Sequence, residues 1–212
     1  GKGKLLMSGF FNSHAHTPMT LMRGYGENMA LQSWLNDRIF PFEDKLMGDD
    51  VYFATLLGIA ESLRYGIVST TDMYYFCDRM AEAVLESGAK NNLGRGLTSF
   101  TDADLWNLPA YSESKYLFEQ YNNKGEGRIK VDMSLHAEYT SNPKIVRQLS
   151  EFTKELGTRM HVHISETIDE HRSCKERYGK TPVAYFNDLG LLDSKTTAAH
   201  CVFVEGEDFD IL

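Results

Sequence analysis

The sequence contains few cysteines and no long apolar run. Its 212 residues include three cysteines without paired spacing, which favours a reducing compartment over a disulfide framework. No apolar segment approaches the roughly 20 residues needed to cross a bilayer, and the first residues do not resemble a signal peptide. Basic residues are also scarce relative to acidic ones, and the net charge of -8 argues against nucleic acid or an anionic membrane as the partner. We therefore expect a cytoplasmic protein.

Short apolar segments alternate with segments of helical periodicity along the whole chain. The expected strands are residues 5–12, 67–72, 93–100, 129–135, 159–164 and 196–201. The expected helices are residues 31–39, ended by Pro41, then 49–65, 78–87, 112–121, 143–156, 168–178 and 182–189, with the start of another over 206–212. Residues 17–27 are expected to form a loop, and residues 123–127 a turn.

This alternation predicts about six strand–helix units around a parallel sheet. A doubly wound open sheet and a (β/α) barrel both fit such a pattern. The open sheet usually has a glycine-rich phosphate loop after its first strand, and none is present here. A complete barrel needs eight units and typically about 250 residues. We therefore predict a single α/β domain over residues 1–212, with about six of the eight units of a (β/α)8 TIM-type barrel.

Histidines follow several of the predicted strands. His14 and His16 are two residues apart, so on a strand both side chains point to the same side, as in the start of a zinc site. Two solvated loop histidines are the alternative. His136, His163 and His200 stand at the ends of later strands, and in an α/β protein the loops at that edge converge on one site. Three histidines suffice for a catalytic metal with one open position.

Glu166 follows His163 by three residues, which would place a carboxylate beside the metal, where it can move protons. A helix-start carboxylate favoured by the helix dipole is the alternative. His161 should face the barrel interior and serve in packing, whereas His171 lies on a predicted helix and is expected to be solvated.

Three motifs in this order resemble the amidohydrolase superfamily, and they look most like its S-adenosylhomocysteine/5′-methylthioadenosine deaminases: Phe11-Asn12-Ser13-His14-Ala15-His16, His163-Ile164-Ser165-Glu166-Thr167 and Ala198-Ala199-His200-Cys201-Val202. The resemblance implies one zinc ion, or iron, bound by His14, His16, His163 and His200. It also implies that Glu166 shuttles a proton to a purine ring nitrogen while metal-bound hydroxide attacks the amino-bearing carbon and ammonia leaves.

The resemblance implies four substrate contacts as well. Trp34 would pack on the nucleoside, Glu43 would hold the ribose hydroxyls, His136 would lie near the ligand, and Arg95 would reach the carboxylate of the homocysteine part. Trp34 can equally be a core residue of its helical face. Glu43 and Arg95 can equally be solvated surface residues.

Some expected parts of the family pattern are missing from the sequence. The aspartate that ends strand 8 in the family, the last two barrel units and the flanking β-sandwich segments have no counterpart in residues 1–212. Because the aspartate is missing, a non-catalytic metal-binding fragment remains an alternative. Guanine deaminase or triazine hydrolase activity is another, since the motifs are also close to those members of the family. The open sheet edges of an incomplete barrel also lead us to expect self-association, so a homo-oligomer is possible.

Overall fold

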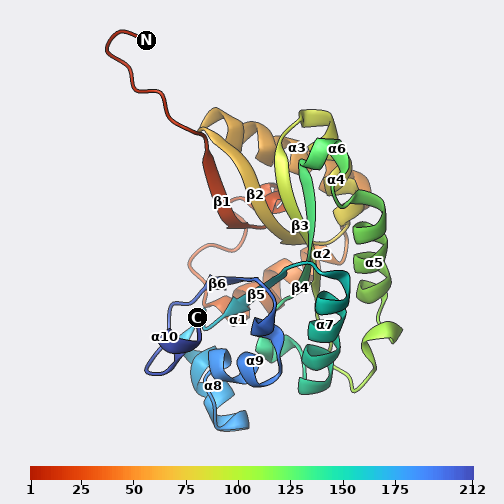
Figure 1. The fold of residues 1–212 in the computed structure, drawn as a ribbon, viewed down its shortest axis with the longest axis vertical. Helices are drawn as coiled ribbons and strands as arrows, with labels where there is room; N and C mark the ends of the chain where they lie inside the picture. The colour runs from red at the N-terminus through yellow and green to blue at the C-terminus, as the bar shows by residue number, and fades with distance from the viewer.

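Six parallel strands form one sheet in the order of the sequence (Figure 1). The computed structural model describes residues 1–212. The strands are β1 (Phe10–Ala15), β2 (Ile67–Tyr74), β3 (Lys90–Leu97), β4 (Ile129–Leu135), β5 (Met160–Ile164) and β6 (Thr196–His200). Each strand pairs in parallel with the next, and the sheet curves into a nearly closed barrel. The predicted partial TIM-type barrel of six units is confirmed.

Helices connect the strands and cover the outside of the sheet. The longer ones are α3 (Gly48–Arg64), α4 (Cys77–Ser87), α5 (Pro109–Tyr121), α7 (Pro143–Leu156), α8 (Ile168–Tyr178) and α9 (Pro182–Asp188). The shorter ones are α1 (Leu31–Trp34), α2 (Phe40–Glu43), α6 (Lys124–Gly127), α10 (Asp208–Ile211), the π-helix η2 (Leu35–Ile39) and four 3₁₀ helices, η1 (Thr17–Met22), η3 (Leu105–Asn107), η4 (Glu138–Thr140) and η5 (Leu191–Asp193). None of these helices is both long and apolar enough to span a membrane.

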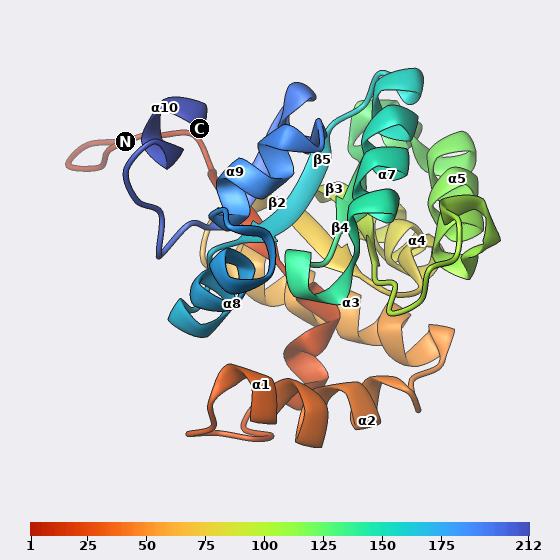
Figure 2. The same ribbon diagram turned by 90° about the horizontal axis from the view of Figure 1, so that it is seen from below.

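The segment from α1 to α2 lies beyond the carboxyl ends of the first strands, as Figures 1 and 2 show. Its side chains line a cavity together with residues from the ends of β2 and β3. This segment therefore covers the edge of the sheet at which parallel α/β proteins build their sites.

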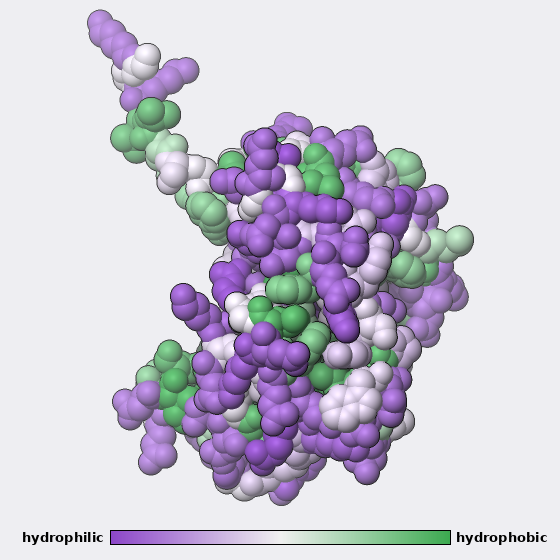
Figure 3. Space-filling model, turned by 45° about the vertical axis from the view of Figure 1, so that its right-hand side comes forward, coloured by the Kyte–Doolittle hydropathy of each residue, from purple (hydrophilic) through white to green (hydrophobic).

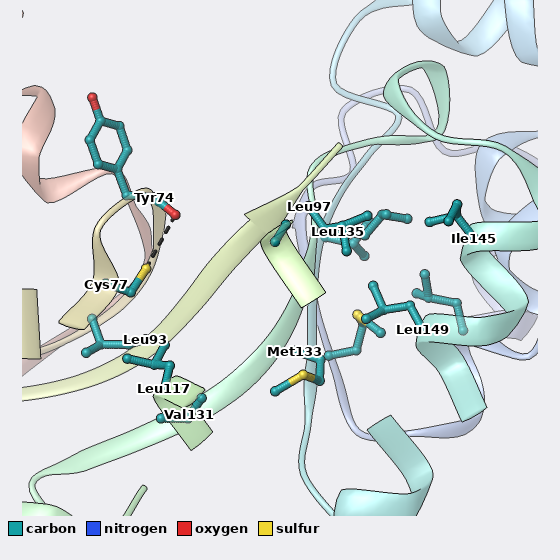
Figure 4. Packing of buried hydrophobic residues seen from close by; sticks show 14 of the residues in the cluster. Tyr74, Cys77, Leu93, Leu97, Leu117, Val131, Met133, Leu135, Ile145 and Leu149 are labelled. Carbon is teal, nitrogen blue, oxygen red and sulfur yellow. Dashed lines mark hydrogen bonds between the residues drawn. The ribbon is translucent and has the colours of Figure 1, made fainter. Parts of the chain in front are cut away.

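The core between β3, β4 and α7 is fully buried (Figure 4). Leu135 at the end of β4 faces Ile145 and Leu149 of α7, and Leu97 is its partner on β3. Both ends of α7 are capped. The Asn142 side chain accepts a hydrogen bond from the Ile145 amide, and Gly157 adopts φ 62° after the last turn. Truncating such a buried leucine to alanine typically costs about 2–5 kcal/mol.

The two outer strands of the sheet are far less covered than the central ones. Every residue of β5 is buried, whereas Phe10 and Phe11 of β1 are 55% and 71% exposed. The segment before β1 stands away from the body and carries exposed apolar side chains (Figure 3). The predicted first strand, residues 5–12, is therefore placed wrongly: β1 begins five residues later, since no neighbouring strand pairs with the earlier residues.

Further element boundaries differ from the sequence prediction. Pro41 does not end its helical segment. The preceding π-helix ends with a hydrogen bond from the Phe40 amide to the Leu35 carbonyl. Pro41 then lies in the first turn of α2, where a backbone N–H has no partner within the helix, so its missing N–H costs nothing. β3 lies three residues before the predicted strand. The expected loop after His16 begins with the 3₁₀ helix η1.

Candidate active site

Three histidines from two strands converge at the carboxyl end of the barrel. One ring nitrogen from each of His14, His16 and His163 lies within 4.8 Å of the others. His14 belongs to β1, His16 follows it, and His163 belongs to β5, which sits on the other side of the curved sheet. Curvature of the sheet thus brings together residues 147 positions apart.

The hydrogen bonds of His16 and His163 fix which ring nitrogens are free. Nδ1 of His16 lies 2.6 Å from the Met73 carbonyl oxygen, and Nδ1 of His163 lies 2.6 Å from the His136 carbonyl oxygen. Because a carbonyl oxygen only accepts, each Nδ1 carries the proton, and each Nε2 presents a lone pair. These two Nε2 atoms face one another at 3.3 Å. Such an arrangement fits a cation between them, and the carbonyl partners orient the rings as in known metal sites.

Burial keeps the imidazoles of His14 and His163 neutral, the form that binds metals. Desolvation, followed by the nearby His16 and His200, lowers the pKa of His14 to about 3. Desolvation also lowers the pKa of His163 well below its usual value, with His136 as the next cause. A ligand nitrogen that is already unprotonated binds a metal ion without first losing a proton.

His200 lies beside this cluster without belonging to it. Its ring centroid is 5.0 Å from that of His14 and 5.2 Å from that of His163. Its Nε2 is 3.6 Å from Oε1 of Glu166. The structure therefore brings all four predicted histidines together, but only three of them have nitrogens within the common 4.8 Å.

Glu166 lies in the loop between β5 and α8, just before the residue that caps the helix. Its side chain is 26% exposed, so it is neither buried nor fully solvated. Glu166 is not the capping residue of α8, because the capping side chain is that of Thr167, whose hydroxyl accepts the Glu170 amide hydrogen. Glu166 instead points its carboxylate toward His200, at the rim of the histidine cluster.

A small cavity of about 70 Å³ leads away from His16 and is lined by Trp34, Glu43, Tyr74 and His136. Three of the four predicted substrate residues thus share one cavity with a member of the histidine cluster. Burial raises the pKa of Glu43 to about 7. Burial has the opposite effect on a histidine, because it disfavours the cationic form, and it lowers the pKa of His136 to about 4. The alternative of a solvated Glu43 is wrong, and Trp34 lines the cavity as well as contacting the core.

A second cavity of about 870 Å³ continues beyond Glu43, which lines both. The fourth predicted substrate residue, Arg95, lies there. Its side chain is 14% exposed, its Nε donates to Oε2 of Glu113 at 2.5 Å, and its guanidinium lies 4.6 Å over the Tyr75 ring. Arg95 is therefore not a solvated surface residue.

Asp72 escaped the sequence analysis, His161 was assigned only a packing role, and His171 was assigned wrongly. Asp72 is completely buried in β2, where it accepts hydrogen bonds from the backbone amide and hydroxyl of Thr17, next to His16. His161 faces inward as expected, but its Nε2 also lies 2.9 Å from Nδ1 of His14. His171 is only 4% exposed, because its ring packs against Ser165 and Glu205, so the prediction of a solvated side chain is wrong.

Glu170 was also missed, and it organises the loop that carries Glu166. The pattern Thr167-x-x-Glu170 is a capping box, a signal that the sequence does contain. Burial, opposed by backbone hydrogen bonds, raises the pKa of this carboxyl to about 7.

Comparison with known proteins gives the family of this site. The amidohydrolase family matches residues 5–212, which is nearly the whole chain. The chain belongs to the amidohydrolase family. It is 39% identical over its full length to the 5-methylthioadenosine/S-adenosylhomocysteine deaminase of Caldanaerobacter subterraneus subsp. tengcongensis, of which it covers 49%. It is 39% identical to the enzyme of that name from Carboxydothermus hydrogenoformans, of which it covers 48%. The chain thus spans about half the length of these curated relatives.

Solved amidohydrolase structures have the same fold. An adenosine deaminase from Xanthomonas campestris with bound zinc superposes with a TM-score of 0.88 at 28% identity, covering 97% of this chain and 47% of its own. A guanine deaminase from C. acetobutylicum superposes with a TM-score of 0.87 at 18% identity, covering 97% and 51%, which supports the fold alone. His14, His16 and His163 of this amidohydrolase could hold a metal ion.

Proposed function

We propose that this chain carries the metal and substrate site of a hydrolytic deaminase acting on an aminopurine nucleoside, such as S-adenosylhomocysteine, 5′-methylthioadenosine or adenosine. The observation that carries the proposal is the pair of facing Nε2 lone pairs of His16 and His163, with His14 beside them and Glu166 at the rim. The full-length relatives named for the deamination of such nucleosides support the choice of substrate.

The metal would be one zinc ion, with iron as the other candidate, held by His14, His16 and His163, with His200 as the proposed fourth histidine. Zinc prefers neutral imidazole nitrogen, and the lowered pKa values of His14 and His163 supply it. A divalent ion there supplies Lewis acidity, which makes water nucleophilic at neutral pH.

Glu166 is the proposed proton carrier. Its carboxylate takes a proton from the attacking water and delivers it to the purine ring nitrogen, while water oxygen bonds to the amino-bearing carbon. Glu166 would then carry the second proton from the added oxygen to the amino nitrogen. The bond from the carbon to that nitrogen breaks as the oxygen becomes a carbonyl, and the nitrogen leaves as ammonia. Its partial exposure beside His200 supports this role, since a proton carrier must reach both the water and the substrate.

The two connected cavities would hold the rest of the substrate. Glu43 would accept hydrogen bonds from the ribose hydroxyls, Trp34 would pack on the nucleoside, and His136 would contact the ligand from the end of β4. Arg95 in the outer cavity would bind a carboxylate on the 5′ substituent. Their placement along one path from His16 supports this order.

Metal analysis and ammonia release from the purified protein test the proposal together. We expect about one zinc per chain and ammonia from at least one of the three nucleosides. Ammonia from guanine alone, or chloride from a chlorotriazine, would instead support the alternative hydrolase activities. Zinc without any turnover would leave a non-catalytic metal-binding protein, and the absence of both would contradict the proposal.

We also propose that the chain self-associates through the open edges of its sheet. β1 and β6 each pair with only one strand, and Phe11 and Val202 near these edges are 71% and 62% exposed. Exposed apolar edges of this kind favour association. Elution of the 24.1 kDa chain as a monomer from a sizing column would contradict it.

A further inference from the structure

One buried carboxylate binds the backbone of the whole loop that presents Glu166. Oε1 of Glu170 accepts the Ser165 amide hydrogen at 2.9 Å, and its Oε2 accepts the Glu166 amide hydrogen at 2.7 Å. The Thr167 amide lies 3.5 Å from the same Oε2. Glu170 is 4% exposed, so these hydrogen bonds form away from water.

The contacts of Glu170 go beyond those of an ordinary helix cap. In a capping box, the carboxylate of the third helical residue binds the amide of the capping residue, here Thr167. The shorter bonds of Glu170 instead go to Ser165 and Glu166, which precede the cap and take no part in the helix. The carboxylate therefore fixes the direction in which Glu166 leaves β5.

The backbone held by Glu170 is in a conformation that needs support. Ser165 has φ 49°, in the left-handed region that is unfavourable for residues with a side chain. Its carbonyl oxygen accepts the Val202 and Phe203 amide hydrogens, and so joins this loop to the turn that follows His200. A strained residue persists only where its surroundings fix it, and at Ser165 those surroundings are Glu170 on one side and the β6 turn on the other.

We propose that Glu170 is a positioning residue for the reaction: its carboxylate holds the loop from Ser165 to Thr167 so that Glu166 reaches the attacking water and the substrate. The assignment rests on the proposed function, because it takes Glu166 as the proton carrier. Glu170 itself contacts none of the four histidines through its carboxylate hydrogen bonds, so its loss should leave metal binding in place.

The test uses two substitutions of Glu170 in the zinc-loaded protein. Glu170→Gln keeps one acceptor oxygen and puts an amide NH₂ where the other oxygen accepted a hydrogen bond, whereas Glu170→Ala removes both acceptors. We expect kcat to fall roughly tenfold in the first variant and roughly 100-fold in the second, since small displacements of a catalytic group have effects of this size. KM and zinc content should stay within about twofold of the wild type.

Thr167→Val provides the matched control for a purely structural role. It removes the hydroxyl that caps the Glu170 amide, and leaves the Ser165 and Glu166 amides free to bind the Glu170 carboxylate. We expect this variant to lower Tm in the same way as Glu170→Gln, with a much smaller change in kcat. Equal losses of kcat in the two variants at equal Tm would overturn the proposal, as would an unchanged kcat in Glu170→Ala.

Amide hydrogen exchange over residues 165–167 separates this proposal from the proposed function, since it needs no turnover. Exchange should be faster in Glu170→Gln than in the wild type and in Thr167→Val, because the loop from Ser165 to Thr167 loses one of its two acceptor oxygens. If the wild type releases no ammonia, the proposed function fails. Amide exchange still tests whether Glu170 fixes the loop from Ser165 to Thr167. Unchanged exchange in Glu170→Gln would overturn the proposal whatever the activity.

Discussion

Nε2 of His16 and Nε2 of His163 face each other at 3.3 Å, with each ring held from behind by a backbone carbonyl. Two neutral imidazoles in this arrangement direct lone pairs at one another, which is unfavourable unless something positive lies between them. The barrel holds the rings there from β5 and from the residue that follows β1, two strands that are not neighbours in the sheet order. The fold thus positions the histidines for a cation before any cation binds.

Metal removal should therefore destabilise the protein. Zinc that binds only the folded state stabilises it by about 2.7 kcal/mol at a free concentration 100 times Kd. We expect zinc to raise Tm, a chelator to reverse the rise, and His163→Ala to abolish it. His171→Gln, which changes a buried histidine outside the cluster, should keep the zinc-dependent rise in Tm. If His171→Gln also abolished that rise, the effect would not come from zinc bound by the histidine cluster.

Glu166→Gln should separate metal binding from turnover. Gln keeps the size of the side chain but cannot carry the proton, and removal of a general acid–base group typically lowers kcat by about 10²–10⁴-fold. Zinc content should match the wild type, because the carboxylate lies at the rim of the cluster rather than within it. A variant with normal zinc and near-normal kcat would exclude Glu166 as the proton carrier.

Glu43→Gln should change how stability depends on pH. Burial raises the pKa of Glu43 to about 7 from its ordinary 4.5, so between these values the folded state holds a proton that the unfolded state has lost. Wild-type stability attributable to Glu43 is then fully present below 4.5 and declines as pH rises through 7. Relative to wild type, Glu43→Gln should gain about 2 kcal/mol on going from about pH 5 to about pH 8.

Urea unfolding at the two pH values measures this difference. Glu27→Gln, which alters an exposed glutamate, is the control and should follow the wild type. An identical pH dependence in Glu43→Gln and wild type would mean that Glu43 is not protonated in the folded protein near neutral pH.

The effect of Arg95→Gln on KM should depend on the 5′ substituent of the nucleoside. A hydrogen bond to a charged group contributes about 1.5–3 kcal/mol, so loss of the guanidinium should raise KM roughly 10- to 100-fold for S-adenosylhomocysteine. KM for 5′-methylthioadenosine, which has no carboxylate, should change little. Equal effects on both substrates would show that Arg95 supports the cavity through Glu113 and Tyr75 and does not recognise a carboxylate.

The sequence predicted the parts of the fold that depend on local pattern. Alternation of apolar strands with amphipathic segments identified all six strands, and Asn142-Pro143 marked the start of α7 correctly. Boundaries failed where local pattern conflicts with tertiary context. Leu5 and Leu6 belong to a segment as apolar as a buried strand, but no neighbouring strand pairs with it. Pro41 follows a π-helix, which no local sequence pattern predicts.

The site was predictable wherever a residue stands at a strand end, as His14, His136 and His163 do. Residues that act through buried hydrogen bonds were harder to find. Asp72 looks like an ordinary residue at the end of an apolar segment, and only the folded chain brings Thr17 to its carboxylate. His171 shows the opposite failure, because its helix has no strong apolar pattern, yet the turn after β6 covers it.

X-ray absorption at the zinc edge of the zinc-loaded protein tests the central claim most directly. If His14, His16 and His163 hold the ion, the spectrum should show at least three imidazole nitrogens at about 2.0–2.1 Å and no sulfur. His163→Ala should lose one imidazole from the count. A zinc shell containing sulfur, or a wild-type spectrum without imidazole scattering, would contradict the assignment of these histidines as the metal ligands.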